Sequence, residues 1–252
     1  MYLEPSEEPS LSDRRRLTSF DDRPLDVRWG LRDVIYGALS TIGIFVVLLG
    51  AVVIAYAAGI ALGIAALSEE GIVKSVFALE AVLLLPAWFW GPRRYQTGLS
   101  TLGLRGFDPL KGVLAVVIGF GLTLALDVAW TPVVDNLELS EQPNVLPMFG
   151  EGVSGLLVAL LVGAVVAPIA EEVLFRGFFY AGLRNAWGRG WAIVVSAVVF
   201  AVVHGFSGVI PPIFLMGVIL ALAYEYTGSI WPSILLHSAV NSFSFLVAFF
   251  AQ

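Results

Sequence analysis

After residue 33, long apolar stretches alternate with short polar segments along the whole chain. A helix needs about 20 mostly apolar residues to cross a bilayer, and most of these stretches reach or approach that length. The pattern therefore predicts an all-α, polytopic bundle of about seven transmembrane helices. The predicted helices are residues 34–67, 75–92, 110–134, 153–184, 191–207, 209–225 and 230–250.

The charges between these stretches predict the orientation of the chain. If the N-terminus is cytoplasmic, every Lys and Arg except Lys74 falls on the cytoplasmic side, and the outer loops carry mainly Asp and Glu. This asymmetry is typical of the positive-inside rule. We therefore expect a multi-pass protein of the cell membrane with a cytoplasmic N-terminus.

Three regions differ in character. Residues 1–33 are polar, of mixed charge and rich in proline, which predicts a disordered cytoplasmic tail. Residues 34–152 are expected to supply N-terminal transmembrane helices without a recognisable motif. Residues 153–252 are expected to form the helical core that carries the chemistry, because the unusual polar residues lie there.

Composition excludes several classes of protein. The chain is 58% hydrophobic and only 13% charged, so a soluble enzyme is not expected. It has no cysteine, which excludes disulfides, thiolate metal sites and a cysteine nucleophile. A net charge of −6 offers no basic surface for nucleic acid.

Ionisable residues inside membrane helices are costly and are functional candidates by default. Most of those in this chain, including both histidines, gather in the C-terminal third. Asp127 and Glu80 stand alone in other helices and are more typical of structural residues. The C-terminal residues form three clusters with i,i+4 spacing, namely Glu171-Glu172 with Arg176, Phe200 with His204, and His237 with Asn241.

Helical geometry divides the first cluster. Glu172 and Arg176 can form an ion pair, whereas Glu171 lies about 100° around the helix and stays available for proton transfer. If residues 185–190 are a cytoplasmic turn, Glu171 and His204 each lie about 20 Å from it along antiparallel helices. A carboxylate and an imidazole are thus expected to face each other inside the bilayer.

A carboxylate, two imidazoles and an amide suit amide hydrolysis by activated water. The carboxylate, assisted by an imidazole, acts as base, while the Asn amide and the second His stabilise an oxyanion. Zinc held by Glu171, His204 and His237 would also activate water, and the sequence leaves this alternative open. Two non-proteolytic alternatives also remain. One is a membrane scaffold or immunity protein, and the other is a transporter with Glu171, His204 and Asp127 as a proton relay.

The three clusters resemble the EExxxR, FxxxH and HxxxN motifs of the intramembrane CPBP family, the CAAX proteases and bacteriocin-processing enzymes. This Abi family includes the type II CAAX prenyl endopeptidases. The motifs occur in the family's order and cover roughly residues 165–245.

The resemblance implies an intramembrane endopeptidase without a cofactor, whose site opens toward the cytoplasm. Glu171 would then be the water-activating base assisted by His204, and His237 with Asn241 would form the oxyanion hole. The remaining motif residues, Glu172, Arg176 and Phe200, would support the site. The expected partners are the lipid bilayer and a membrane-associated protein or peptide substrate, prenylated or not.

Overall fold

The computed structural model describes residues 27–61, 80–140, 144–205 and 208–251. These residues are mostly helical and include no strand, which confirms the predicted all-α fold. The longer helices are α2 (Leu31–Ala61), α5 (Pro109–Leu137), α9 (Arg189–Val202), α10 (Ile210–Thr227) and α11 (Trp231–Phe250). Short helices lie between them, namely η1 (Glu80–Leu83), α4 (Leu84–Trp88), η2 (Phe89–Arg93), η3 (Leu99–Leu102) and η4 (Leu146–Phe149).

Within the described residues, five helical segments are long and apolar enough to cross a membrane. Helix α9 is apolar but shorter, and the predicted stretch 75–92 is described only from residue 80 onward. The polytopic helical bundle is thus confirmed, whereas seven spans and a cytoplasmic N-terminus stay predictions. The five segments are Leu31–Ile60, Pro109–Leu137, Gly152–Trp187, Ile210–Thr227 and Trp231–Phe250.

The segment Gly152–Trp187 is one long helix of changing pitch. It consists of α6 (Gly152–Leu161), η5 (Val162–Val166), α7 (Ala167–Glu172), η6 (Val173–Tyr180) and α8 (Ala181–Trp187). Both η5 and η6 are π-helical, and η5 directly precedes the turn that contains Pro168. The proline ring removes one hydrogen bond from the helix, and the wider π-turn beside it changes the helix geometry at that point.

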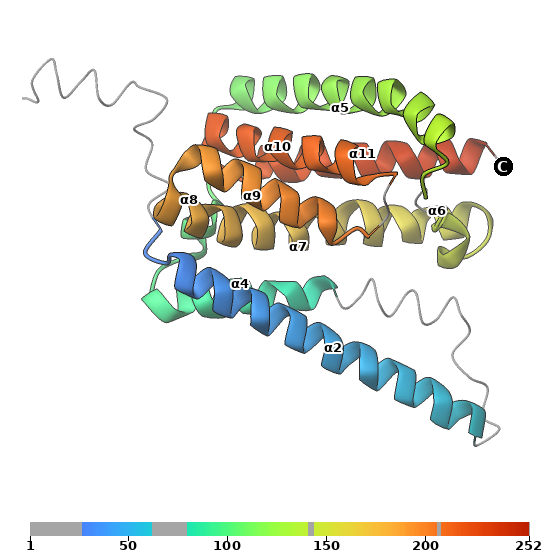
Figure 1. Ribbon diagram of the computed structural model, residues 1–252, viewed down its shortest axis with the longest axis horizontal. Coiled ribbons are helices and arrows are strands. Elements are labelled where there is room, and N and C mark those ends of the chain that lie inside the picture. Colours follow the sequence, from blue (N-terminus) through green and yellow to red (C-terminus); the bar gives the residue numbers. More distant parts are fainter. Residues whose placement is uncertain (1–26, 62–79, 141–143, 206–207, 252) are drawn as a thin grey trace, which may run out of the picture.

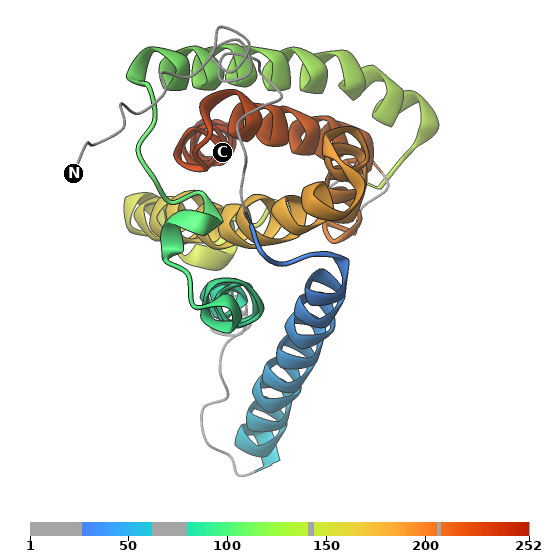
Figure 2. The same cartoon turned by 90° about the vertical axis from the view of Figure 1, so that its left-hand side faces the viewer.

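The helices are arranged in layers around this segment. Figures 1 and 2 show α5 lying across α10 and α11, which in turn pack against Gly152–Trp187 and α9. Helix α4 covers the opposite side of the segment, and α2 slants away from the bundle beyond it. The central helix is therefore enclosed on several sides.

Local signals set the ends of these helices. The side chain of Asp108 accepts hydrogen bonds from the backbone N–H groups of Leu110 and Lys111, which caps α5. Gly188 adopts a φ of 78° between α8 and α9, a conformation that favours glycine. This turn confirms the hairpin that we predicted at residues 185–190.

The disordered tail that we predicted for residues 1–33 extends too far, because its last residues are part of the folded structure. Residues 1–26 lie outside the described part of the chain, but residues 27–33 are packed. Trp29 is fully buried, its indole N–H donates to the carbonyl of Phe178 at 3.0 Å, and its own carbonyl accepts from Asn185 at 2.9 Å. These partners are about 150 residues away, so nothing near Trp29 in the sequence indicated its burial.

Candidate active site

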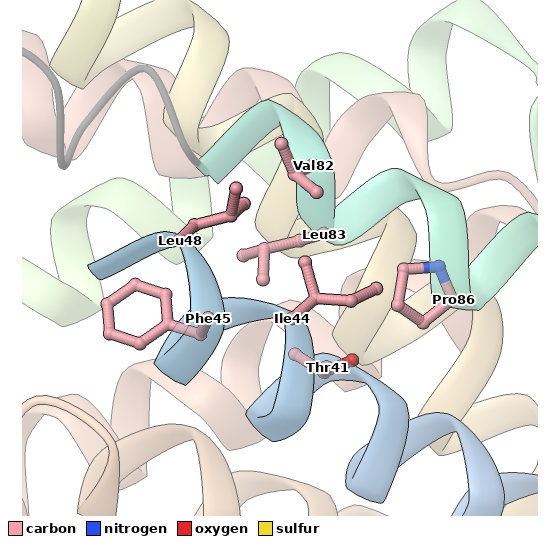
Figure 3. Close-up of a pocket in the computed structure, with 7 residues that line it drawn as sticks. All are labelled: Thr41, Ile44, Phe45, Leu48, Val82, Leu83 and Pro86. Atoms are coloured by element: carbon pink, nitrogen blue, oxygen red, sulfur yellow. The ribbon is translucent and has the colours of Figure 1, made fainter. Parts of the chain in front are cut away.

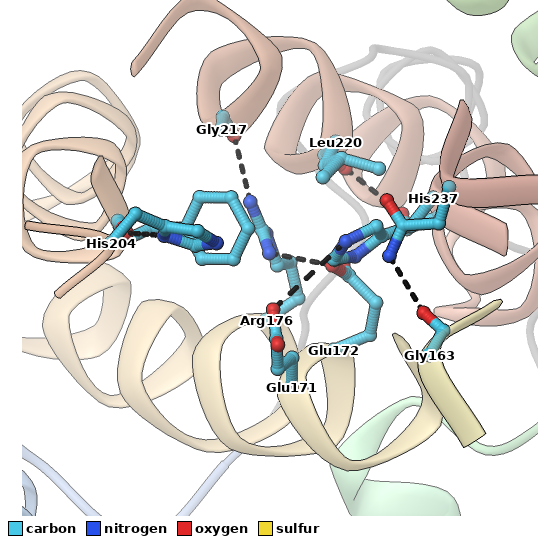
Figure 4. A network of polar contacts seen from close by, with 11 residues as sticks. Gly163, Glu171, Glu172, Arg176, His204, Gly217, Leu220 and His237 are labelled. Atoms are coloured by element: carbon cyan, nitrogen blue, oxygen red, sulfur yellow. Dashed lines mark hydrogen bonds and ion pairs between the residues drawn. The ribbon is translucent and has the colours of Figure 1, made fainter. Parts of the chain in front are cut away.

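The candidate site lies where the central helix meets α9, α10 and α11 (Figure 4). Glu171 and Glu172 are the last residues of α7, and Arg176 follows one turn later in η6. Phe200 comes from α9 and His237 from α11. The structure thus brings residues of all three sequence clusters into one region.

Glu172 and Arg176 form the predicted ion pair at the centre of the site. Arg176 Nη1 lies 2.6 Å from Glu172 Oε1, and both residues are almost completely buried. Arg176 Nη2 donates to the carbonyl of Gly217 at 3.3 Å, and the guanidinium lies 4.2 Å from the centre of the Phe200 ring. A buried charge is tolerated only with such partners, and the pair, the carbonyl and the ring supply them.

His237 lies between the two glutamates. Its Nδ1 is 3.0 Å from Glu172 Oε1, and its Nε2 is 3.9 Å from Glu171 Oε2. Because the ion-paired carboxylate of Glu172 can only accept, Nδ1 carries the proton of this hydrogen bond. The orientation of the ring therefore directs Nε2 toward Glu171.

Glu171 has different surroundings from its neighbour. Its side chain is 17% exposed, compared with 0% for Glu172. Its Oε2 is buried and makes no hydrogen bond to any residue in the described ranges. Glu172 Oε2 likewise makes no hydrogen bond, but Glu172 Oε1 contacts both Arg176 and His237. The two carboxylates therefore differ in their charged partner and in their exposure, and the more exposed Glu171 is the better placed to accept a proton from water.

His204 does not lie inside a helix, as the sequence suggested, because α9 ends at Val202 and His204 is in the following turn. Its Nδ1 is 2.8 Å from the carbonyl oxygen of Phe200, so Nδ1 donates and Nε2 stays available. The His204 ring lies 5.0 Å from the Phe200 ring, and the His237 ring lies 5.8 Å from it. Phe200 is thus the common contact of both histidines and Arg176.

Asn241 lies one turn after His237 on α11. Its Nδ2 donates to the carbonyl of Gly163, in the π-turn η5, at 2.9 Å. An amide carries two N–H groups, so one remains for another acceptor. The hydrogen bond fixes the orientation of the amide toward the central helix.

The alternative of a zinc site depends on whether the donor groups converge. Among the described residues, no three His, Asp or Glu side chains are grouped to hold a metal ion. The predicted set of Glu171, His204 and His237 is not such a group, and the zinc alternative stays a prediction.

A second buried polar cluster lies on the same helix, and the sequence did not indicate it. A charged residue near the end of a membrane helix usually faces water, but Glu225, near the end of α10, is only 4% exposed. Its Oε1 accepts from Tyr180 Oη and from Arg184 Nε, each at 2.5 Å. The i,i+4 spacing of Tyr180 and Arg184 was the available signal, but their partner is 41 residues from Arg184.

Asp127 and Glu80 lie outside both clusters. Asp127 is exposed on α5, and its carboxylate makes no hydrogen bond or ion pair with the described residues. The Glu80 backbone begins η1, but its side chain lies outside the described part. The sequence-based interpretation of Glu80 therefore stays untested.

Comparison with known proteins is consistent with this geometry. Residues 153–243 match the family of type II CAAX prenyl endopeptidase Rce1-like proteins. The matched range contains every residue that we predicted for the site. The similarity to the Rce1-like family lies in this C-terminal part of the chain. The resemblance inferred from the three motifs is thereby confirmed for this range.

Three relatives resemble different lengths of the chain. The UPF0177 protein YxdF of Lactococcus lactis is 32% identical over 80 residues, which are 31% of this chain and 44% of the relative. The putative membrane peptidase YdiL of Bacillus subtilis is 31% identical over 84 residues, 33% of this chain and 34% of the relative. The chain thus spans less than half of these two relatives.

The similarity to a third relative extends beyond the Rce1-like region. The membrane-embedded CAAX protease MroQ of Staphylococcus aureus is 26% identical over 192 residues, 68% of this chain and 73% of the relative. No solved structure matches the chain.

Proposed function

We propose that this chain is a membrane-embedded endopeptidase in which Glu171 activates the attacking water. The observation that carries this proposal is the difference between two adjacent carboxylates. Glu172 is paired with Arg176 at 2.6 Å, whereas Glu171 is partly exposed, is not paired with an arginine, and has His237 Nε2 at 3.9 Å. Two carboxylates in such different surroundings are suited to different tasks, one structural and one in proton transfer.

In the proposed reaction, Glu171 takes a proton from water while the water oxygen bonds to the peptide carbonyl carbon. The carbonyl electrons move to its oxygen, and His237 Nε2–H and the remaining N–H of Asn241 donate to that oxyanion. The C–N bond then breaks, and Glu171 returns the proton to the leaving amine. His204, whose Nε2 is available, assists Glu171 as the second imidazole.

The charges of the site favour this assignment. With both carboxylates ionised, Glu171, Glu172 and Arg176 leave one excess negative charge in a region of low dielectric constant. The proposed reaction uses a proton on His237 Nε2, 3.9 Å from Glu171 Oε2, as the N–H that the oxyanion needs. The distance of 3.9 Å between His237 Nε2 and Glu171 Oε2 is longer than a hydrogen bond. The two groups are therefore not bonded directly to each other, and both can act on the same substrate from different sides.

The proposed substrate is a membrane-associated protein or peptide, prenylated or not. The similarity to the CAAX protease MroQ of Staphylococcus aureus supports a lipidated substrate, and the apolar surroundings of the site fit one. The distribution of Lys and Arg supports a site that opens toward the cytoplasmic side of the cell membrane. Besides its substrate, the proposed partner is the bilayer, and no nucleic acid is involved.

The test compares Glu171→Gln with wild-type protein in the same cells, using mass spectrometry of protein termini in membranes. Loss of the general base should reduce the wild-type-specific termini by about 100-fold or more. Asp127→Asn is the matched control, because it removes an isolated carboxylate outside the site and should leave these termini unchanged. Equal melting temperatures in detergent would establish that all three proteins are folded.

The same experiment separates the alternatives. Termini that persist at the wild-type level in Glu171→Gln would show that Glu171 is not the base. If no termini depend on the wild-type protein and Glu171→Gln only lowers the melting temperature, the scaffold or immunity function would replace the protease. An effect of Asp127→Asn on proton flux in liposomes would instead favour the relay.

We further propose that the reaction requires no metal. Purified protein should therefore keep its activity after stringent chelation, and elemental analysis should find no stoichiometric zinc. Loss of activity that returns specifically with zinc would contradict this proposal and support the metal-dependent alternative.

A further inference from the structure

The contact between α2 and α4 contains an open groove on the side of α4 away from the candidate site. The groove has a volume of about 310 Å3 and is lined by Ser40 and Ile44 of α2 and by Leu85, Trp88 and Phe89 on the facing segment. A smaller apolar gap of about 10 Å3 adjoins it and shares Ile44 with it (Figure 3). The two helices therefore do not pack tightly along this side.

Aromatic side chains surround the end of the groove that is nearest the start of α2. The Trp90 ring lies 5.0 Å from the Tyr36 ring and 5.3 Å from the Phe89 ring. Trp90 Nε1 donates to Ser40 Oγ at 2.9 Å, which links the aromatic cluster to the groove. Tyr and Trp gather where a membrane helix meets the polar headgroups, so this end is expected at the membrane–water interface.

Arginine side chains flank the same aromatic rings. The Arg32 guanidinium lies 5.4 Å from the Tyr36 ring, and the Arg94 guanidinium lies 5.2 Å from the Trp90 ring. Arg93 directly precedes Arg94 in the chain, and its exposed side chain makes no hydrogen bond or ion pair within the described ranges. Among the described residues of this group, Asp33 is the one carboxylate, and it pairs with Arg94 at 3.1 Å. The mouth of the groove thus carries an excess of positive charge.

We propose that this groove binds one anionic phospholipid, with its phosphate at Arg32 and Arg93 and one acyl chain between α2 and α4. Guanidinium groups match phosphate oxygens in geometry and charge. Along α2, Ser40 and Ile44 lie about 12 and 18 Å beyond Arg32, and half of the hydrocarbon core measures about 15 Å. A chain whose headgroup is held at the arginines therefore reaches the groove at its natural depth.

The same charges disfavour a second copy of the chain as the occupant. In a twofold contact through this face, the arginine groups of both copies would approach each other. The apolar groove would also accept a prenyl chain, but a neutral prenyl group gives no role to the exposed arginines. The combination of an apolar groove and a cationic mouth therefore favours an anionic lipid.

The experiment is native mass spectrometry of the full chain with phosphatidylglycerol or phosphatidylcholine of identical acyl chains. Wild-type protein should retain one phosphatidylglycerol at least about fivefold more strongly, because each arginine near an anionic headgroup contributes about that factor. Raising the salt concentration before detergent exchange should lower this preference. Equal retention of the two lipids, or a preference that salt does not change, would overturn the proposal.

Two kinds of variant test the headgroup contacts and the acyl-chain groove separately. Arg32→Gln combined with Arg93→Gln should lower phosphatidylglycerol retention to the level of phosphatidylcholine, and Ile44→Trp should lower the retention of both lipids. The matched controls are Lys111→Gln, a cation at the start of α5, and Val47→Trp, an exposed position on α2 outside the groove. Neither control should change retention, and gel filtration should show that each variant is folded.

A competition experiment distinguishes a lipid from a lipidated substrate. A farnesylated peptide should leave the bound phosphatidylglycerol in place. If the peptide displaces the lipid, and Ile44→Trp abolishes this displacement, the groove is a prenyl site and the phospholipid proposal is wrong. None of these measurements depends on Glu171 or on proteolysis, so the outcome is independent of the proposed activity.

Discussion

The two longest apolar helices of this chain differ completely in their packing. In the most apolar window of Leu31–Ile60, none of the residues is buried inside the protein, whereas 44% are buried in the corresponding window of Gly152–Trp187. The two windows have nearly the same mean hydropathy. Hydropathy therefore identifies helices that enter a bilayer, but it does not indicate which of them forms the protein interior.

The difference arises from residues that are not apolar. Lipid chains solvate Leu and Val as well as another helix does, so burial in a membrane protein depends on close contacts and polar interactions. Gly152–Trp187 contains both, because Gly177 and Gly182 permit close packing and Glu172 pairs with Arg176. Helix α2 contributes a hydrogen bond from Trp90 to Ser40 and few other polar contacts along its apolar part.

Removing one arginine that pairs with an acidic residue of each helix should give the largest contrast. Arg176→Met leaves the carboxylate of Glu172 buried without its ion pair and should lower the free energy of unfolding by about 3–5 kcal/mol. Arg94→Met breaks a pair with Asp33 in which the arginine side chain is 43% exposed, and should cost no more than about 1 kcal/mol. Denaturant titration of both variants in the same micelles measures the difference. If both variants lost a similar free energy of unfolding, burial would not explain how much each ion pair contributes to stability.

Adding one methyl group to each helix should have a smaller but still opposite effect. In Gly177→Ala the new Cβ would lie 2.6 Å from the backbone oxygen of Leu102, so the helices must shift, at a cost of about 1–3 kcal/mol. In Gly50→Ala, on α2, the Cβ meets nothing within 4 Å, and the better helix propensity of alanine should leave stability unchanged or raise it by up to about 1 kcal/mol. Melting temperatures in detergent test this pair. Destabilisation by Gly50→Ala would mean that α2 packs against a partner along this face.

The smallest expected effect is the pH dependence of the contact between Tyr95 and α2. The Tyr95 hydroxyl donates to Asp33 Oδ2 at 2.7 Å, and this hydrogen bond, together with burial, raises the pKa of Tyr95 above its usual value of 10.0. The folded state therefore favours the protonated phenol, so this contribution is complete below about pH 10 and is lost as pH rises through the higher folded pKa.

The measurement compares wild-type protein with Tyr95→Phe between pH 8 and pH 11.5. The stability advantage of the wild type should be less than about 1 kcal/mol, because the pair is partly exposed, and should disappear at the alkaline end. An advantage that does not change with pH would exclude ionisation of Tyr95 as its cause.

Much of the helical framework follows from the sequence because its signals are local. Apolar stretches gave the helices, and the turn at Gly188 followed from polar residues between two of them. The i,i+4 spacing of Glu172 and Arg176 gave their ion pair without any tertiary information. These predictions depend on residues within one or two helical turns of each other.

The remaining features depend on contacts between distant segments. Trp29 is buried against Phe178 and Asn185, and Glu225 pairs with Arg184, although each resembles a surface residue in its local sequence. The sequence also placed His204 inside a helix, because valine and alanine continue up to it, whereas α9 ends two residues earlier. The partners of His237 and Asn241 lie on the central helix, 65 and 78 residues away, and no periodicity in α11 reveals them.

The π-helical stretch η6 has a consequence for insertions and deletions. It separates Glu172 from Tyr180, and so sets the angle around the helix axis between the two buried polar clusters. A wider turn accommodates one more residue than an α-helical turn does. If the pitch of the stretch is unchanged, deleting a single residue between Val173 and Phe179 rotates one cluster by roughly 100° relative to the other, and only a return to regular pitch would offset this rotation. Chain length within this stretch is therefore as constrained as the identity of the charged residues on either side of it.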